Sequence, residues 1–457
     1  MVAEAAADVS VALGPAESVT DEFAATMTHL LASARTDGAP IHLFSAVSGG
    51  PDSMALACMA DRFAHNSGAH DISVRHTVLI VDHGIRADSA DEARRVAARL
   101  RRRGMNVEIL RVTARSPRAG LQAWARRHRY ALMLARVRQS RGCLLLGHHA
   151  GDQAETVMMR LRRGSGLAGL AAMQPDSWRQ GVLILRPLLG IAPEALADHC
   201  RACGIAFERD PTNADHRYER VRVRAALAAA PDVMSDRLVS LARMAGSIDR
   251  ALLSALAEDG YLPTFRPSGH CTLPVTVTRL PTVAATRLLG FVIARIAAPS
   301  PPPSMLALSR LRARLEEGRP ATLGGARFSR HDSGWLVTAE IGRSPPRRPV
   351  VAGERALFAG VWEITSGVDA TVRHLGEAGS GVGRPWRDTP GWCALPSLVR
   401  RALPVLETLD GALIYPHLQG SEMCNGAVAE ATATFLSQSP ALGAPVLETA
   451  IGKTHRY

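Results

Sequence analysis

The chain is poor in lysine, aromatic residues and cysteine, and it lacks a long uncharged apolar run. Of its 457 residues only Lys453 is a lysine, and 4% are Phe, Trp or Tyr. The seven cysteines are an odd number scattered through a long chain, which argues against a secreted disulfide framework. Acidic Glu4 and Asp8 open the chain, and no stretch of about 18 uncharged apolar residues occurs, so we expect neither a signal peptide nor a membrane span. We therefore expect a cytoplasmic protein.

The composition predicts a folded, basic protein of several domains. Hydrophobic residues make up 47% and charged residues 21% of the chain, values typical of globular proteins, and the length suggests about three domains. Lys and Arg together number 54 against 42 Asp and Glu, which gives a formal net charge of +12. This excess favours contact with a polyanion such as nucleic acid, although a solvated basic surface or a compositional bias towards arginine would produce it too.

The segment at residues 41–56 predicts a strand, a glycine turn and a helix. An apolar run at 41–47 has the length of a buried strand, and apolar residues return with helical spacing after the turn. Two adjacent glycines let a phosphate approach the backbone, and the N–H groups of the first helical turn then point at it. Asp52 could hold a cation that neutralises the phosphate charge. The predicted phosphate site consists of Ser48, Gly49, Gly50, Pro51, Asp52 and Ser53.

The same turn has two other interpretations. Residues 46–50 lie one position away from the G-x-S-x-G nucleophile elbow, in which Ser48 would be the nucleophile. The two glycines could also form a simple connection that binds no ligand. A Walker loop is excluded, because residues 452–454 are the only G-K-[ST] sequence and Leu447 stands where the earlier glycine is required.

Strands and helices are expected to alternate through the first part of the chain. Apolar runs predict strands at 41–47, 74–81, 107–112 and 143–147, and helical spacing predicts helices at 21–34, 89–103, 121–138, 152–161 and 193–204. Ser89 and Glu92 have the spacing of a capping box. This order predicts an α/β fold with a mostly parallel, doubly wound sheet, in which ligands bind beyond the carboxyl ends of the strands.

Polar side chains gather where these strands end, which predicts one shared site. They are residues 48–53 after the first strand, Asp82, His83 and Arg86 after the second, and His148, His149, Asp152 and Glu155 after the fourth. Asp152 and Glu155 could simply be an N-cap and its capping box. The functional interpretation is that these carboxylates face nucleotide phosphates through magnesium, with His149 near the reacting base.

The rest of the chain is expected to form two further domains. Residues 216–342 look mainly helical, with prolines at 299–303 between two helices and a hairpin within 323–338. The stretch 343–349 predicts a linker, and 350–457 a small α+β domain. Cys200 and Cys203 have redox or zinc spacing but no second pair. The predicted divisions are a leader at 1–39, a catalytic domain at 40–215, and domains at 216–342 and 350–457.

A series of motifs along residues 41–225 resembles the tRNA(Ile)-lysidine synthase family of the PP-loop superfamily, the N-type ATP pyrophosphatases. The motifs are Ser48-Gly-Gly-Pro-Asp-Ser53, Asp82-His-Gly-Ile-Arg86, Ala125-Arg-Arg-His-Arg-Tyr130, His148-His-Ala-Gly-Asp-Gln-Ala-Glu-Thr156, Arg163-Gly-Ser-Gly-Leu-Ala-Gly-Leu170, Arg186-Pro-Leu-Leu189, and Asp210-Pro-Thr-Asn213 with Arg220 and Arg224. Two positions depart from the family pattern, since Gly151 stands where an acid is usual and Val221 where Asn is usual. The first departure could lower the rate or the lysine affinity, or Glu155 could take over.

This resemblance implies an enzyme that attaches free L-lysine to C2 of cytidine 34 in the CAU anticodon of tRNA(Ile), using ATP and Mg²⁺. The reaction would pass through an adenylated cytidine and release AMP and pyrophosphate. The implied catalytic residues are Asp52, His149, Asp152 and Glu155, and the implied metal ligands are Asp52 and Asp152. Nucleotide contacts would come from Ser48, Gly49, Gly50, Pro51, Asp52, Ser53, His83 and Arg86, and tRNA contacts from Arg163, Arg220, Arg224 and the domain at 350–457. A homodimer is possible.

Three rival hypotheses remain. A thiolating tRNA enzyme of the same superfamily would need sulfur-handling cysteines near the loop, where the sequence offers Cys58 alone. A hydrolase that uses Ser48 would need a triad histidine late in the chain. A degenerate tRNA-binding module, inactive because of Gly151, would retain tRNA without turnover.

Overall fold

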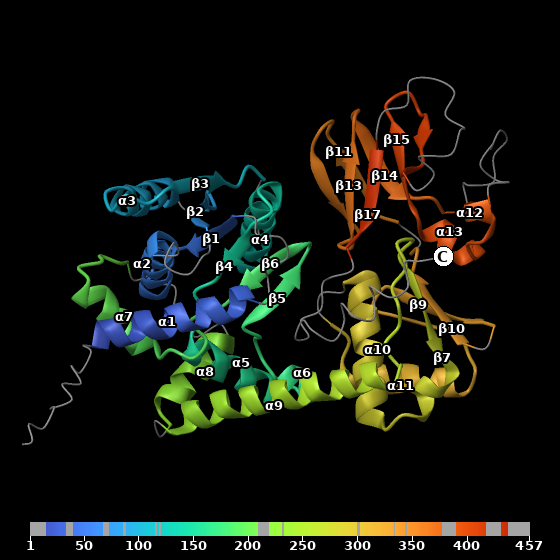
Figure 1. The fold of residues 1–457 in the computed structure, drawn as a ribbon, viewed down its shortest axis with the longest axis horizontal. Coiled ribbons are helices and arrows are strands. Elements are labelled where there is room, and N and C mark those ends of the chain that lie inside the picture. The colour runs from blue at the N-terminus through green and yellow to red at the C-terminus, as the bar shows by residue number, and fades with distance from the viewer. Residues whose placement is uncertain are drawn as a thin grey trace, which may run out of the picture. The chain divides into compact units, whose positions relative to one another are not determined.

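The computed structural model describes most of the chain in separate stretches (Figure 1). These are residues 15–32, 40–66, 73–85, 88–114, 117, 120–208, 219–230, 233–298, 302–332, 334–342, 345–376, 390–416 and 431–436. Their internal packing divides the chain into two units. The first contains Met1–Arg163, Ala171–Ser177 and Val182–Arg243, and the second contains Gly164–Leu170, Trp178–Gly181 and Met244–Tyr457. The domain boundaries expected near 215 and 343 remain predictions.

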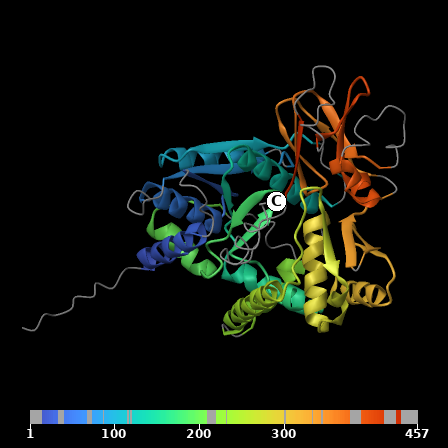
Figure 2. The ribbon, with the colours of Figure 1, turned by 45° about the vertical axis from the view of Figure 1, so that its right-hand side comes forward.

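A six-stranded sheet forms the centre of the first unit. Its strands are β1 (Ile41–Val47), β2 (Val74–Asp82), β3 (Val107–Arg111), β4 (Cys143–Leu145), β5 (Asp176–Arg179) and β6 (Val182–Leu185). They lie in the order β3-β2-β1-β4-β6-β5, which the labels of Figure 1 follow, and the neighbours from β3 to β6 are parallel. Figure 2 gives a second view of the chain, turned by 45°. The strand order reverses between β1 and β4, and ligands of such sheets bind at the carboxyl ends beside this switch point.

Helices cover the sheet. In chain order they are α1 (Pro15–Ala32), α2 (Pro51–Asn66), α3 (Ser89–Arg101), α4 (Leu121–Gln139), α5 (Ala150–Arg162), α7 (Pro193–Ala202), α8 (Glu219–Ala228) and α9 (Val233–Glu258), of which α9 continues into the second unit. The crossovers that contain α2 and α4 run in opposite directions across the sheet, and right-handed crossovers then place these helices on opposite faces. Accordingly, α4 packs on Phe44, Leu79 and Leu144. The predicted doubly wound α/β fold is confirmed.

The predicted elements of this unit are present, but several have other bounds. The first helix, expected at 21–34, begins at Pro15 and is described to Ala32, and the fourth strand, expected to reach 147, ends at Leu145. The helix expected from Asp152 begins earlier, at Ala150. The capping box predicted for Ser89 and Glu92 is wrong, because Ser89 is already helical and its hydroxyl donates to Asp82 Oδ1 at 2.8 Å. Asp82 also accepts from the N–H of Gly84 at 3.0 Å. A side-chain partner from the preceding strand has therefore replaced the local cap.

The second unit combines helices with antiparallel sheets. Its helices are α6 (Leu167–Leu170), the 3-10 helix η3 (Val275–Arg279), α10 (Thr282–Ala297), α11 (Met305–Glu316), α12 (Pro390–Cys393) and α13 (Ser397–Ala402). Its strands are β7 (His270–Pro274), β8 (Ala321–Leu323), β9 (Ala326–His331), β10 (Gly334–Ala339), β11 (Arg347–Val350), β12 (Arg355–Phe358), β13 (Trp362–Ser366), β14 (Ala370–His374), β15 (Pro404–Thr408), β16 (Leu413–Ile414) and β17 (Ala431–Phe435). They form sheets in the orders β7-β10-β9-β8, β11-β14-β15-β16 and β12-β13-β17.

The core of this unit contains residues from both sides of the predicted linker. Leu288, Phe328 and Trp335 belong to the same buried cluster as Val372 and Val405. The hairpin predicted within 323–338 is confirmed by the antiparallel pair β9 and β10, and α10 and α11 flank the prolines at 299–303 as predicted. None of the helices in the described part of the chain has both the length and the apolar character needed to cross a membrane.

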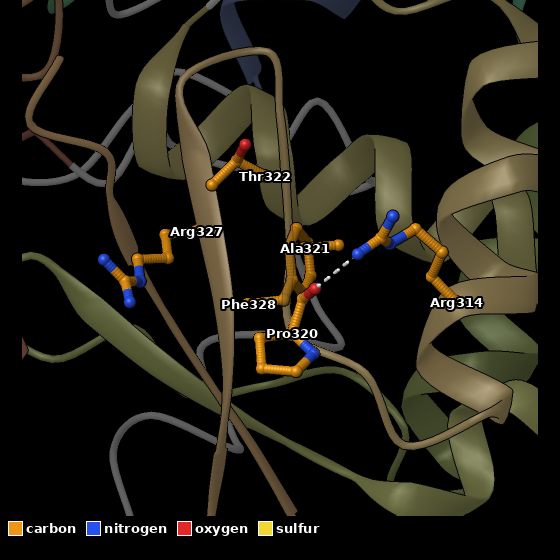
Figure 3. A pocket seen from close by; sticks show the side chains of 6 residues that line it. All are labelled: Arg314, Pro320, Ala321, Thr322, Arg327 and Phe328. Atoms are coloured by element: carbon orange, nitrogen blue, oxygen red, sulfur yellow. Dashed lines mark hydrogen bonds between the residues drawn. The ribbon is translucent and has the colours of Figure 1, made fainter.

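A hollow of about 350 Å³ lies between α11 and the sheet that contains β8 and β9 (Figure 3). It is lined by Arg314, Pro320, Ala321, Thr322, Arg327 and Phe328. The guanidinium of Arg314 donates to the Pro320 carbonyl at 3.3 Å. This lining has no carboxylate, imidazole or thiol, so it offers no group for acid–base chemistry or for holding a divalent metal.

Candidate active site

The turn between β1 and α2 has the geometry of a preformed phosphate cradle. Gly49 has a φ of +90°, a conformation that favours glycine, and a Cβ there would lie 3.0 Å from Cγ2 of Val96. The Ser53 hydroxyl accepts from the Ser48 N–H at 3.1 Å and donates to the Gly50 carbonyl at 3.0 Å. Pro51, which has no N–H to leave unpaired, is the first residue of α2. The predicted strand, turn and helix are therefore all present, and the turn is held in shape by its own hydroxyls.

His149 lies between the carboxylates of Asp52 and Asp152. Its Nε2 is 3.7 Å from Asp52 Oδ2 and 3.7 Å from Asp152 Oδ2. The N–H of Asp152 donates to His149 Nδ1 at 3.4 Å, and Asp152 Oδ2 accepts from the His149 N–H at 3.2 Å. His149 is thus the N-cap of α5, and the capping box joins His149 to Asp152 rather than Asp152 to Glu155. If Nδ1 accepts, the proton of a neutral imidazole is on Nε2, which faces both carboxylates.

Glu155 is buried one turn further along α5 and is held by two arginines of α8. Arg220 Nε donates to Glu155 Oε2 at 2.6 Å, and Arg224 Nε donates to Glu155 Oε1 at 2.5 Å. Nη2 of Arg220 donates to Asp152 Oδ1 at 2.7 Å. One guanidinium therefore bridges the two acids of α5. The tRNA contact predicted for Arg220 and Arg224 stays a prediction, but in this structure both side chains bind acids of the candidate site.

The two aspartates differ in their electrostatics. Burial raises the pKa of Asp52, and the negative charge of Asp152 adds to this effect, while His149 opposes it. Burial also acts to raise the pKa of Asp152, but His149 and Arg220 outweigh it, so that the pKa of Asp152 is lowered. Asp152 is thus held ionised by fixed partners. Asp52, whose side chain is 32% exposed, is the carboxylate that gains most from an added cation.

Glu194 is a neighbouring acid that the sequence analysis did not select. It lies in the first turn of α7, and its charge helps to raise the pKa of Asp52. The start of α7 is close to α5, since a Cβ at Gly151 would be 3.6 Å from Pro193 Cγ and the Ala150 N–H donates to the Ile191 carbonyl at 2.9 Å. No spacing in the sequence pointed to Glu194, because α7 reaches the site only through this packing.

The histidines that follow β2 and β4 each leave one buried ring nitrogen without a hydrogen bond to the described part of the chain. The Nδ1 atoms of His83 and His148 are buried without a hydrogen bond among the described residues. Burial lowers the pKa of His148 to about 4, and burial followed by the charge of Arg129 lowers the pKa of His83. Both imidazoles are therefore neutral near pH 7. Arg86 lies outside the described residues.

The remaining predicted features are an exposed arginine, a segment outside the described residues, and a buried thiol bonded to the backbone of the turn. Arg163 follows the end of α5 and pairs with Glu219 at the start of α8. Residues 210–213 lie outside the described residues. Cys200 is a buried thiol whose Sγ donates to the Pro51 carbonyl at 3.4 Å, and burial raises its pKa to about 12. Among the described residues, no group of three or more His, Cys, Asp or Glu side chains is arranged to hold a metal by itself.

A comparison of the sequence with models of protein families identifies the domain that contains this sheet and glycine turn. Residues 20–230 match the model of the PP-loop domain, so this part of the chain is a PP-loop domain. Solved structures that resemble it include the U34-tRNA thiolase NcsA from Methanococcus maripaludis, at 18% identity and a TM-score of 0.39, which covers 50% of this chain and 80% of that one. NAD+ synthetase from Burkholderia pseudomallei gives 14% identity and a TM-score of 0.31, covering 52% and 94%. Both likenesses are too weak to support an inference.

Curated relatives narrow the family. A tRNA(Ile)-lysidine synthase of Ruegeria pomeroyi is 35% identical over 77% of this chain and 83% of its own length. Proteins of the same name from a Bradyrhizobium species and from Hyphomonas neptunium are 39% and 36% identical, over 56% and 70% of this chain and 74% and 86% of their own lengths. The chain belongs to the tRNA(Ile)-lysidine synthase family.

Proposed function

We propose that this protein is an ATP-dependent ligase that attaches free lysine to C2 of cytidine 34 in the CAU anticodon of tRNA(Ile). Family membership supports this proposal, and the observation that carries it is the meeting of a preformed phosphate turn with Asp52, His149 and Asp152 at one switch point. In this reaction the C2 oxygen of the cytosine is adenylated by ATP. The lysine ε-amine then attacks C2 and expels AMP.

The turn supplies what the phosphates of ATP require. The positive-φ Gly49 and the first turn of α2 present backbone N–H groups, on which negative charge is stabilised. The hydroxyls of Ser48 and Ser53 lie 3.3 Å apart and add donors. These groups would hold the departing pyrophosphate, so that the α-phosphorus is aligned with the cytosine oxygen.

The chemistry of the site fits Mg²⁺ as the partner of ATP. Mg²⁺ is usually bound by one or two carboxylates together with substrate phosphates, rather than by a cage of protein ligands. Asp52 and Asp152 provide two carboxylates on either side of His149, which is compatible with the lack of a larger ligand cluster among the described residues. When bound, the ion would neutralise the charge that develops on the phosphates. Asp52 and Asp152 are the residues that would hold it.

The protein's own groups then have distinct roles in this proposal. Asp152 keeps its negative charge through Arg220 and His149, and it fixes the imidazole of His149 through the cap of α5. His149 would orient the reacting cytosine. The neutral imidazoles of His83 and His148 could accept or donate hydrogen bonds to a base without adding charge. We keep the prediction that residues 350–457 contact the tRNA and that a homodimer is possible.

The thiolation alternative is disfavoured by the state of the nearby thiols. Burial raises the pKa of Cys58 to about 11 and that of Cys200 to about 12. A thiol is nucleophilic as its thiolate, and both groups are protonated at neutral pH. The inactive-module alternative rests on Gly151, which stands where the family usually has an acid. This position is next to the site, since a Cβ there would lie 3.1 Å from Cε1 of His149.

Transfer of labelled lysine tests the proposal directly. Protein, ATP, Mg²⁺ and labelled lysine are incubated with unmodified transcripts of tRNA(Ile) with the CAU anticodon and of methionine tRNAs with the same anticodon. We expect label on the isoleucine tRNA alone, together with AMP. Binding of this tRNA without transfer of lysine or formation of AMP would instead support an inactive module. Sulfur transfer in place of lysine would support the thiolase alternative.

A further inference from the structure

We propose that Arg220 and Arg224 are positioning residues that fix the carboxylates of Asp152 and Glu155, rather than contacts to the tRNA backbone. We call the two arginines with these two acids the α5–α8 clamp. The activity part of this inference rests on the proposed function. The structural part rests only on contacts within the first unit.

The burial of Glu155 requires such partners. Its side chain is 4% exposed, and a buried carboxylate is costly unless it is paired and hydrogen-bonded. Both of its oxygens are occupied, one by Arg220 Nε and the other by Arg224 Nε, at 2.6 and 2.5 Å. Because Glu155 is nearly inaccessible and each of its oxygens is bound by a guanidinium, we assign it the role of holding the two guanidinium groups in place.

Arg220 also binds Asp152, and so it links the carboxylates of Glu155 and Asp152. Its Nε donates to Glu155 at 2.6 Å and its Nη2 donates to Asp152 at 2.7 Å. Because the guanidinium is planar, this bridge sets the direction in which Asp152 Oδ1 points. The other oxygen, Oδ2, accepts from the His149 N–H and lies 3.7 Å from His149 Nε2. A lysine could supply the charge of Arg220, but it lacks the planar fork that bridges two acids.

The charges around the loop indicate what the clamp leaves available. The negative charges in this region are those of Asp52, Asp152, Glu155 and Glu194, and the two guanidinium groups of the clamp supply positive charge. Asp152 and Glu155 are bound by these guanidinium groups at 2.5 to 2.7 Å, whereas the ion-pair contact of Asp52 is His149 Nε2 at 3.7 Å. The clamp thus neutralises the acids of α5, and the negative charge that still needs a cation is at Asp52, beside the phosphate turn.

Arg163, the third residue predicted to contact the tRNA, forms an ion pair beside the same two helices. Arg163, at the end of α5, pairs with Glu219, the first residue of α8. Arg163, Arg220 and Arg224 all lie in ion pairs between α5 and α8 or the residues beside them. Their spacing in the sequence is therefore explained by helix pairing, without a phosphate backbone.

The test compares charge removal inside the clamp with charge removal beside it. The variants are Arg220→Gln, Arg224→Gln, Glu155→Gln, the double variant Glu155→Gln/Arg224→Gln, and the control Arg222→Gln, which removes an exposed charge from the same helix. Three measurements are made on each full-length protein. They are tRNA affinity at about 50 and about 200 mM salt, the rate of lysine transfer at saturating tRNA, and the melting temperature.

We expect Arg220→Gln and Arg224→Gln to lower kcat by about 10- to 100-fold, the usual effect of removing a group that orients a reacting ligand. Their tRNA affinity and its salt dependence should equal those of the wild type. The double variant should lose no more activity than the worse single variant, and its loss of melting temperature should be smaller than the sum of the two single losses, because the charges act as one unit. The control should keep wild-type kcat.

A weaker tRNA affinity, with a salt slope reduced by about one and kcat unchanged, would mark Arg220 or Arg224 as a phosphate contact and overturn the inference. Independent, multiplying losses in the double variant would overturn it too. If Arg224→Gln does not fold, Arg224→Lys provides the single variant, and a restored melting temperature in the double variant supports the clamp. Absence of lysine transfer by the wild type would refute the proposed function instead, while the coupling in melting temperature still tests the clamp.

Discussion

Replacing Gly49 by alanine should destabilise the first unit and weaken the phosphate turn. Two costs follow from the structure. The φ of +90° at Gly49 is a conformation that costs a residue with a side chain about 1–3 kcal/mol. The new methyl group would also lie 3.0 Å from Cγ2 of Val96 on α3, so that α3 or the turn must move. We therefore expect a total loss of about 2–3 kcal/mol, with the conformational part dominant.

Gly50→Ala is the matched control for this prediction. A Cβ at Gly50 would have Ser48 Oγ, at 3.9 Å, as its nearest neighbour, and Gly50 does not have a positive φ. The free energy of unfolding of Gly50→Ala should therefore stay close to that of the wild type. Val96 is itself buried, so Val96→Ala alone costs stability and serves as the reference. In that background Gly49→Ala should cost less only by the part that comes from the methyl contact.

The assays are chemical denaturation of the full-length protein, followed at several probes, and the KM for ATP. Gly49→Ala should lower the unfolding midpoint of the transition assigned to the first unit and raise the KM for ATP, because the N–H groups of the turn move. Equal stability of Gly49→Ala and Gly50→Ala would refute the argument from φ. If Gly49→Ala costs no stability in the Val96→Ala background, the methyl contact alone, and not the backbone, sets the cost.

Three further predictions concern titration and reactivity. Asp52→Ala should abolish ATP-dependent AMP formation while leaving tRNA affinity unchanged, as measured by product chromatography and filter binding; unchanged ATP consumption would contradict the role of Asp52. Because burial lowers the pKa of His148 from 6.5 to about 4, the unfolded chain binds a proton there that the native protein does not, and stability should fall as the pH drops from about 6.5 to 4. His148→Gln should flatten the unfolding midpoint over this range, and an unaltered pH profile would argue against it. Exposed Cys203 should react with iodoacetamide at about pH 8 before buried Cys200, as peptide mass spectrometry would detect, and equal labelling would show that α7 opens readily.

The parts of the fold that could be predicted depend on local patterns. The strand at 41–47 was predicted with its observed bounds, because a short apolar run between turn residues has few alternatives. The phosphate turn followed from two glycines at a point where one of them needs a positive φ. The capping box at Ser89 failed because a local rule cannot anticipate Asp82, a hydrogen-bond partner seven residues earlier on a strand.

The contacts that define the site were harder to predict, since they join distant segments. Glu155 and Arg220 are 65 positions apart in the sequence, and neither spacing nor composition indicates that they meet. The arginines were assigned to the tRNA from the family resemblance, whereas the structure gives them carboxylate partners. Glu194 was missed for the same reason, because the packing of α7 near α5 brings it towards Asp52.

The partners of Glu155 also bear on how the protein can be shortened for crystallisation or for binding studies. A fragment that stops before residue 219 would still encode the entire six-stranded sheet and the glycine turn. It would nevertheless expose an acid that the intact chain keeps 4% accessible, with both its cationic neighbours removed. A workable expression boundary therefore lies beyond α8, and no earlier than Arg243, because Leu238 and Val239 of α9 share a buried cluster with Ala154 of α5 within the first unit. Fragments designed from the sheet alone should express poorly or lose nucleotide affinity.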